Sequence, residues 1–398
     1  MSTIPGYGAA ATANFSARMR RVEPFHVMEV QERALVLETA GRHIVHMEIG
    51  QPDFGAPPQV IEAAERALRG RSLAYTSALG LRELREAISG FYAERFGVAV
   101  PVERIAVTTG ASSALLLALG ALVGPGDEVL LPDPCYPCTR HMVSIFEAVP
   151  RSIPVDASSL YQPDAAQVRA AWGPATRGVI LASPSNPTGT KIGWAALGEL
   201  VGQVRSSGGF TIVDEIYLGL SYDAQPRTAL ELRDESVIVT NSFSKYFSMT
   251  GWRLGWLVAP PGLIREVEKL SQNLYVSPPS LSQHAALAAF DPGALAVLEE
   301  RRAEYRRRRD FLVPALRGLR FSVPVMPQGA FYVYAGCEQL APDSSALASR
   351  MLEEAGVAVT PGVDFGSHDA HRHLRFAYTR SLPELEEGVE RMRRMLAR

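Results

Sequence analysis

The sequence is poor in cysteine, nearly balanced in charge and free of long apolar runs. Three cysteines in 398 residues are too few for a disulfide framework, so we expect a cytoplasmic protein. A formal net charge of −2 provides neither a basic field for nucleic acid nor an acidic tail for a basic partner. No apolar stretch approaches the roughly 20 residues that cross a bilayer. The first 21 residues also lack the apolar core of a secretory signal.

The rest of the composition is ordinary for a globular protein, with 47% hydrophobic and 21% charged residues, and the length allows two domains. From about residue 100, short apolar runs alternate with helical stretches. The runs lie at residues 105–108, 128–131, 151–155, 179–183, 210–214, 237–240 and 254–259. This alternation predicts an α/β fold with a mostly parallel seven-stranded sheet that helices cover on both faces.

A second, smaller domain of the α+β type is expected near the C-terminus. Predicted strands at 330–334, 357–360 and 373–377 mix there with predicted helices at 344–354 and 383–396. The expected organisation is an irregular N-terminal arm with a small-domain segment in residues 1–45, the large domain in 46–292 and the small domain in 293–398.

A stretch at 301–309 is rich in arginine. Acidic residues interleave with it, which favours a solvated helix face over a nucleic-acid patch.

Ligands of parallel sheets bind outside the carboxyl ends of the strands, so the polar residues that follow the apolar runs are the candidate site residues. Lys245 follows the run 237–240, after Ser242 and Ser244, and Arg253 lies eight positions further on. Burial beside a strand would favour the neutral, nucleophilic amine. Hydroxyl groups and a guanidinium fork suit a phosphate. A nucleophilic amine next to a phosphate site indicates pyridoxal 5′-phosphate held as a Schiff base, although such a string also occurs in solvated loops.

Two further strand ends carry polar or aromatic groups of the same kind. The turn at Gly110 to Ser112 opens a helix and would present backbone N–H groups to an anion; a plain N-cap by Ser112 or Ser113 is the alternative. Tyr136 follows the run 128–131 and would stack on a planar ring, or be an ordinary core or surface tyrosine.

The remaining candidates are an amide, a carboxylate with its neighbouring phenol, and a guanidinium. Asn186 lies between prolines that would fix its amide, or simply belongs to a tight turn. Asp214 ends an apolar run and needs a partner such as a protonated ring nitrogen, unless it caps a helix. Tyr217 would lie one helical turn further on. Arg375, flanked by apolar residues, would bind a carboxylate or be exposed on a half-buried strand.

Several strings together resemble one protein family. SPSNPTGT, DEIY and SFSK with Arg253 occur in this order, with EIGQPDF, YTSALGLRELREAI and TTGASSAL before them and HLRFAY after them. The set is similar to the fold-type-I pyridoxal-phosphate enzymes of the class I/II aminotransferase family, from about residue 25 to the C-terminus. The resemblance implies an enzyme that moves the amino group of an α-amino acid to a 2-oxo acid.

The resemblance also implies roles for individual residues. Lys245 would be the Schiff-base lysine, Asp214 the partner of the pyridine nitrogen, and Arg375 the anchor of the substrate carboxylate, with Gly50 and Asn186 beside it. For the cofactor phosphate the resemblance implies Ala111, Ser112, Ser242 and Arg253. For the ring it implies hydrogen bonds from Asn186 and Tyr217 to the ring oxygen, and stacking by Tyr136. It also implies a homodimer in which Tyr75 of one subunit contacts the cofactor of the other. It implies no metal, no nucleic acid and no membrane.

The sequence leaves alternatives for the side chain of the substrate and for the type of reaction. No arginine stands in residues 271–279, where members that prefer dicarboxylates often place one, so a neutral or aromatic side chain is favoured. A β-eliminating lyase with the same cofactor is the nearest alternative reaction, and a cofactor-sensing regulator is an alternative of another class. Cys135 and Cys138 form an isolated CxxC string without the second pair or histidines that a metal site needs.

Overall fold

The computed structural model describes residues 15–70, 73–222 and 225–397 and confirms the α/β fold. One sheet has seven strands in the order β2–β8–β7–β6–β5–β3–β4. They are β2 (Ile105–Thr108), β3 (Glu128–Asp133), β4 (Val149–Pro154), β5 (Thr176–Ala182), β6 (Phe210–Asp214), β7 (Val237–Ser242) and β8 (Gly255–Val258). β8 is antiparallel to both neighbours and all other pairs are parallel. The mostly parallel sheet predicted from the apolar runs is therefore confirmed.

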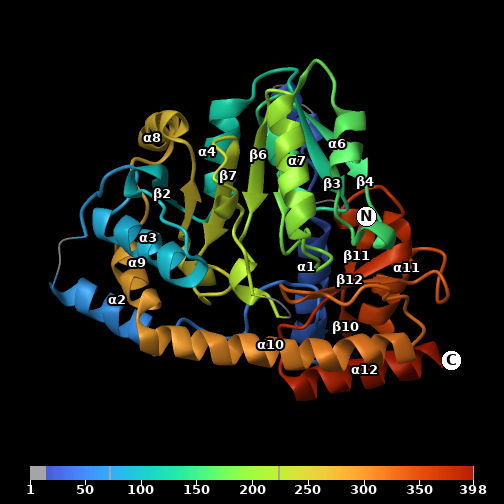
Figure 1. Cartoon of the computed structure of the whole chain (residues 1–398). Coiled ribbons are helices and arrows are strands. Elements are labelled where there is room, and N and C mark those ends of the chain that lie inside the picture. Colours follow the sequence, from blue (N-terminus) through green and yellow to red (C-terminus); the bar gives the residue numbers. More distant parts are fainter. Residues whose placement is uncertain (1–14, 71–72, 223–224, 398) are drawn as a thin grey trace.

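Helices cover both faces of this sheet because successive strand residues point to opposite sides. In β5, Val179 and Leu181 belong to one apolar cluster and Ile180 to another. The cluster of Ile180 includes side chains of α4 (Ala111–Leu122), α5 (Pro137–Ile145) and α8 (Pro261–Leu274). The cluster of Val179 includes side chains of α3 (Arg82–Phe96), α6 (Ala165–Ala171) and α7 (Trp194–Ser206), and α7 lies in front of the sheet in Figure 1.

A second unit contains two small sheets. β11 (Thr360–Pro361), β12 (His373–Ala377) and β9 (Tyr332–Gly336) are antiparallel, and β1 (Val45–His46) pairs in parallel with β10 (Val357–Ala358). Helices α1 (His26–Thr39), α11 (Ser344–Arg350) and α12 (Leu382–Leu396) pack around them. Helix α10 (Pro292–Gly318) runs below both units in Figure 1, with α2 (Pro58–Gly70) and α9 (Ser280–Ala286) beside its start. The N-terminal segment thus joins the C-terminal unit, while the exact domain boundaries stay a prediction.

Three local expectations need correction. The predicted strand 357–360 is divided between two sheets, because the chain passes from β10 to β11 at Val359. The helix predicted to reach residue 354 ends at Arg350 and continues as a π-helical turn, Met351–Ala355. The expected irregular arm contains a 3-10 helix, Ala17–Arg21, while residues 1–14 of that arm lie outside the described residues.

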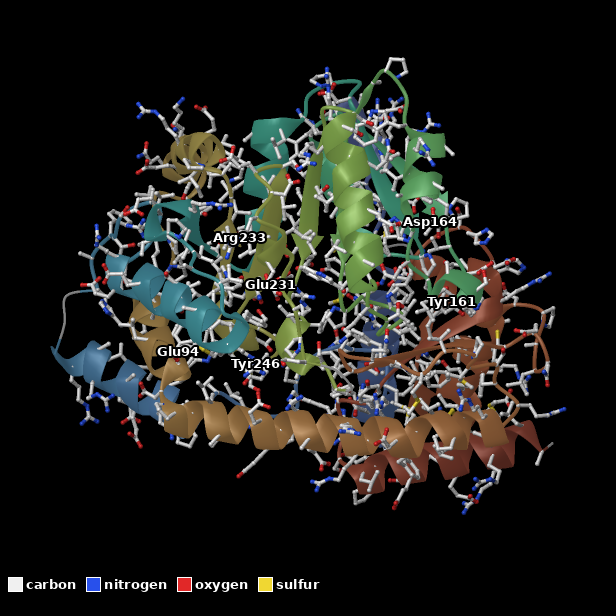
Figure 2. All side chains as sticks on the ribbon, viewed as in Figure 1. Glu94, Tyr161, Asp164, Glu231, Arg233 and Tyr246 are labelled. Carbon is white, nitrogen blue, oxygen red and sulfur yellow. The ribbon has the colours of Figure 1, made fainter. Side chains whose placement is uncertain are left out.

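Charged side chains crowd the outward faces of α2, α8 and α10 (Figure 2), and for α10 the charge pattern predicted such a face. Two arginines of α10 are exceptions, because Arg308 and Arg309 are each only 3% exposed. Arg308 forms a salt bridge of 2.9 Å with Asp53, so part of the arginine-rich stretch fixes a loop instead of facing solvent. None of the described helices is both long and apolar enough to cross a bilayer.

Candidate active site

One cavity of about 240 Å³ lies at the carboxyl ends of β2, β3, β5, β6 and β7. Because β8 runs in the opposite direction, its start lies at the same edge, and Arg253 stands just before it. The predicted site residues that line this cavity are Gly50, Ala111, Ser112, Tyr136, Asn186, Asp214, Tyr217, Ser242, Lys245, Arg253 and Arg375. Tyr75 is not among the lining residues and is 83% exposed.

The N-terminus of α4 forms one end of the cavity. The N–H groups of Ser113 and Ala114 donate to the Gly110 carbonyl, and those of Ala111 and Ser112 have no acceptor among the described residues. No side chain caps the helix, so the alternative of a serine N-cap is wrong. The Ser113 hydroxyl bonds the Thr109 hydroxyl instead. Two free N–H groups at the positive end of a helix dipole make this a place for an anion.

Arg253 adds a positive charge to the same end. Its guanidinium approaches Gly110 so closely that a Cβ there would lie 2.7 Å from Nη2, and its Nη1 donates to the Thr250 carbonyl at 3.1 Å. The φ angle of Arg253 is +52°, in the left-handed region that non-glycine residues rarely adopt. The Ser242 hydroxyl lies 2.9 Å from that of Ser244, which also lines the cavity.

Asp214 lies in the middle of the cavity wall, where β6 ends. Its Oδ1 accepts bonds from the Thr240 hydroxyl at 3.1 Å and the Ile216 N–H at 3.2 Å, and its Oδ2 has no partner among the described residues. Burial raises the pKa of its carboxyl group to about 6. A turn follows Asp214 rather than a helix, so the helix-cap alternative is wrong and Tyr217 is not one helical turn away. A cationic group facing Oδ2 would stabilise the ionised form.

Lys245 reaches into the cavity from the turn after β7. Its Nζ donates to the Gly50 carbonyl at 2.7 Å. Burial, with smaller contributions from the charges of Arg375 and Arg253, lowers the pKa of the amine to about 8, while the charge of Asp214 opposes this shift. With a pKa of about 8, about a tenth of this amine is neutral at pH 7, far more than for an ordinary lysine, and the neutral form is the one that acts as a nucleophile or a base.

Arg375 closes the other end of the cavity and is only 4% exposed, so the alternative of an exposed arginine is wrong. Its guanidinium donates to Asn186 Oδ1 at 3.0 Å, to Thr360 Oγ1 at 3.2 Å and to the Glu48 carbonyl. It also lies between two rings, 4.4 Å from the centre of Tyr332 and 4.7 Å from that of Phe365. No carboxylate of the described residues forms a salt bridge with this buried cation, which leaves its charge available for an anionic ligand.

Sequence reasoning missed the residues that narrow the cavity. Phe25 contacts Tyr136 edge-on, with ring centres 6.1 Å apart. The other lining residues that were not predicted are Val27, Met28, Ile49, Leu115, Ala182, Ile216, Thr250 and Tyr332. Phe25 is the residue directly before α1 and Met28 lies in its first turn. No local pattern indicates that α1 packs against the strand ends. Tyr332 lies within a strand that the sequence predicted, but the sequence analysis did not predict that its side chain lies on the side of the strand that faces the cavity.

The site combines an anion cradle, a carboxylate, an amine and a guanidinium around one cavity. Comparison with known proteins identifies relatives along nearly the whole chain. The family model described as aminotransferase class I and II matches residues 42–392. A valine–pyruvate aminotransferase of Mycobacterium tuberculosis is 39% identical over 93% of this chain and 96% of its own. An aspartate/prephenate aminotransferase of Thermus thermophilus is 34% identical over 96% of this chain and 99% of its own.

Solved structures agree with these relatives. A crystal structure of an aminotransferase from Mycobacterium tuberculosis superposes with a TM-score of 0.93 at 38% identity, and covers 97% of this chain and 100% of that one. Aspartate aminotransferase from Thermus thermophilus with maleate gives 0.92 at 34% identity, over 96% of this chain and 100% of that one. These two relatives and two solved structures are all named as aminotransferases.

Proposed function

We propose that this chain, which belongs to the aminotransferase class I and II family, uses pyridoxal 5′-phosphate bound to Lys245. The chain is an aminotransferase: it moves the amino group of an α-amino acid to a 2-oxo acid. The observation that carries the cofactor proposal is that the Lys245 amine and the Asp214 carboxylate line one cavity, whose end at Ala111 offers free N–H groups.

The donor set fits this cofactor group by group. The N–H groups of Ala111 and Ser112, with Arg253, would hold its phosphate. Asp214 would pair with the ring nitrogen of the cofactor. The protonated ring nitrogen would be the cationic partner that Asp214 Oδ2 lacks among the described residues. The remaining contacts that we propose are Ser242 to the phosphate, Tyr136 to the ring face, and Asn186 and Tyr217 to the ring oxygen. When bound, the cofactor accepts the electron pair left by the broken Cα–H bond.

The protein side chains then bind, orient and move protons. Arg375 offers a planar fork to the α-carboxylate of the amino acid and turns its Cα–H toward Lys245. The Lys245 amine, neutral in part because of its lowered pKa, would take the proton from Cα as a base and then donate it as a general acid to the cofactor carbon that carried the aldehyde. Asp214, ionised above about pH 6, keeps the ring-nitrogen proton in place. Phe25 and Tyr136, which line the cavity and contact each other, would help to exclude water.

The amino donor that we propose has an apolar side chain. Phe25, Val27, Met28 and Ile49 line the cavity and offer apolar surface. The cations among the described lining residues are Lys245, Arg253 and Arg375, each of which already has a role, so a second substrate carboxylate would lack a partner. The relative that is named for valine and pyruvate supports this class, with a small 2-oxo acid as acceptor.

We further propose a homodimer in which Tyr75 completes the site of the partner subunit. Tyr75 does not line the cavity of its own chain and is highly exposed. Leu35, Ile61 and Leu68 also expose more than 40% of their surface, as residues of an interface would in a single chain. A mixture of Tyr75→Ala and Lys245→Ala proteins tests the arrangement. Hybrid dimers should regain activity, because one site then has both residues intact; a mixture without recovery would exclude a shared site.

The cofactor proposal is tested by adding pyridoxal 5′-phosphate to the purified protein. A band at about 400 nm that is absent from Lys245→Ala is expected. Incubation with amino donors and pyruvate or 2-oxoglutarate should then release the 2-oxo acid of the donor without ammonia or thiol. Release of ammonia would favour the lyase alternative. Absence of the band in the unmodified protein would refute cofactor binding.

A further inference from the structure

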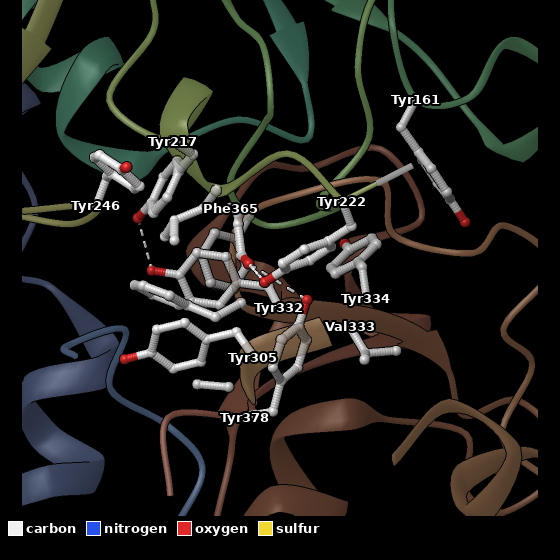
Figure 3. Packing of buried hydrophobic residues seen from close by; sticks show 14 of the residues in the cluster. Tyr161, Tyr217, Tyr222, Tyr246, Tyr305, Tyr332, Val333, Tyr334, Phe365 and Tyr378 are labelled. Atoms are coloured by element: carbon white, nitrogen blue, oxygen red, sulfur yellow. Dashed lines mark hydrogen bonds between the residues drawn. The ribbon is translucent and has the colours of Figure 1, made fainter. Parts of the chain in front are cut away.

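Tyr332 touches three parts of the site and has no role in the mechanism above. Its hydroxyl lies 2.9 Å from that of Tyr217, and Figure 3 shows the two rings meeting at this hydrogen bond. The guanidinium of Arg375 lies 4.4 Å from the centre of its ring. Its hydroxyl also packs against Gly50, where a Cβ would come within 1.7 Å of the oxygen. One buried side chain thus connects the carboxylate anchor with the phenol of Tyr217.

The direction of the hydrogen bond follows from the surroundings. The only acceptor of the Tyr332 hydroxyl among the described residues is Tyr217. Burial raises the pKa of both phenols, so both hydroxyls keep their protons. When Tyr332 donates to Tyr217, both protons have a place, one in this hydrogen bond and one directed toward the cavity that Tyr217 lines. The proton of Tyr217 is then free to point into the cavity.

We propose that Tyr332 is a positioning residue that directs the Tyr217 hydroxyl proton toward the ring oxygen of the cofactor while its ring supports Arg375. This inference rests on the proposed function. A hydrogen bond to the ionised ring oxygen favours the deprotonated form of the lysine-bound chromophore and lowers its pKa. Donation from Tyr332 strengthens that bond, because hydrogen bonds in a chain polarise one another.

Tyr332→Phe tests the proposal, since it removes the hydroxyl and keeps the ring beneath Arg375. The pKa of the lysine-bound chromophore, measured by absorbance against pH, should rise by about half to one unit. The KM for the amino donor should change less than about twofold, because the ring remains. Tyr378→Phe is the matched control: it lies in the same aromatic cluster, bonds the Ala330 carbonyl and does not line the cavity. Its chromophore should titrate as in the unmodified enzyme.

A double-variant comparison separates positioning from general loosening of the core. In a Tyr217→Phe background the chromophore pKa should already be high, and Tyr332→Phe should shift it no further. An equal shift in both backgrounds would overturn the proposal, as would an unchanged pKa in Tyr332→Phe alone. Tyr332→Leu gives an independent test, with the same rise in chromophore pKa and a KM about five- to thirtyfold higher from the lost ring. Absence of any chromophore in the unmodified protein would instead refute the proposed function.

Discussion

Replacing Arg375 with lysine should weaken the binding of every carboxylate substrate. The substitution keeps the charge but removes the planar fork and the stacking between Tyr332 and Phe365. A charge-assisted hydrogen bond contributes about 1.5–3 kcal/mol, and lysine loses at least one of the two that the fork makes to a carboxylate. A loss of about 2–3 kcal/mol corresponds to a rise in KM of about 30- to 150-fold.

The assay follows the amino donor in the first half-reaction and the 2-oxo acid in the second. Both KM values should rise, because both substrates present the same carboxylate, while kcat at saturation should fall much less. Arg380→Lys is a suitable control, because Arg380 donates to the His46 carbonyl at 3.4 Å and does not line the cavity. A KM that changes less than about threefold in Arg375→Lys, with cofactor still bound, would show that Arg375 does not hold the carboxylate.

Three further predictions concern Lys245 and Gly50. Lys245→Ala should lower turnover by several powers of ten while phosphate still binds; near-normal turnover would exclude the lysine as base. The rate at which Lys245 of the cofactor-free protein forms a Schiff base with pyridoxal 5′-phosphate should rise about tenfold per pH unit and level off above about pH 8, because burial lowers the pKa of its amine to about 8. A rate that continues to rise up to pH 10 would contradict the lowered pKa of Lys245. Gly50→Ala should cost about 1–3 kcal/mol of unfolding free energy in denaturant, because the new Cβ meets Tyr332, whereas Gly55→Ala on the same loop has open space and should be near neutral.

Much of the site followed from the order of strands and polar residues in the sequence. Lys245, Asp214 and Asn186 each follow an apolar run, and parallel strands bring their carboxyl ends to one edge, so nearness in space follows from pattern alone. The antiparallel direction of β8 was not predicted, yet it explains why Arg253, which precedes a strand, reaches the same edge.

The hydrogen-bond roles of the same residues depended on packing. Ser112, Ser113 and Asp214 each had a local alternative as a helix cap, which depends on where the helix begins. The structure begins α4 at Ala111 and places a turn after Asp214. Local propensity does not separate these cases, because serine and aspartate favour caps and ligand contacts alike.

The sequence by itself determined the α/β class, the seven strands and the family, since each depends on periodicity or on ordered strings of residues. Only the tertiary structure decided that Phe25 lines the cavity against Tyr136, that Arg308 is buried against Asp53, and that Tyr332 joins Arg375 to Tyr217. These contacts connect segments far apart in the chain. Their geometry is fixed by how helices and sheets pack against one another, which no local pattern of residues records.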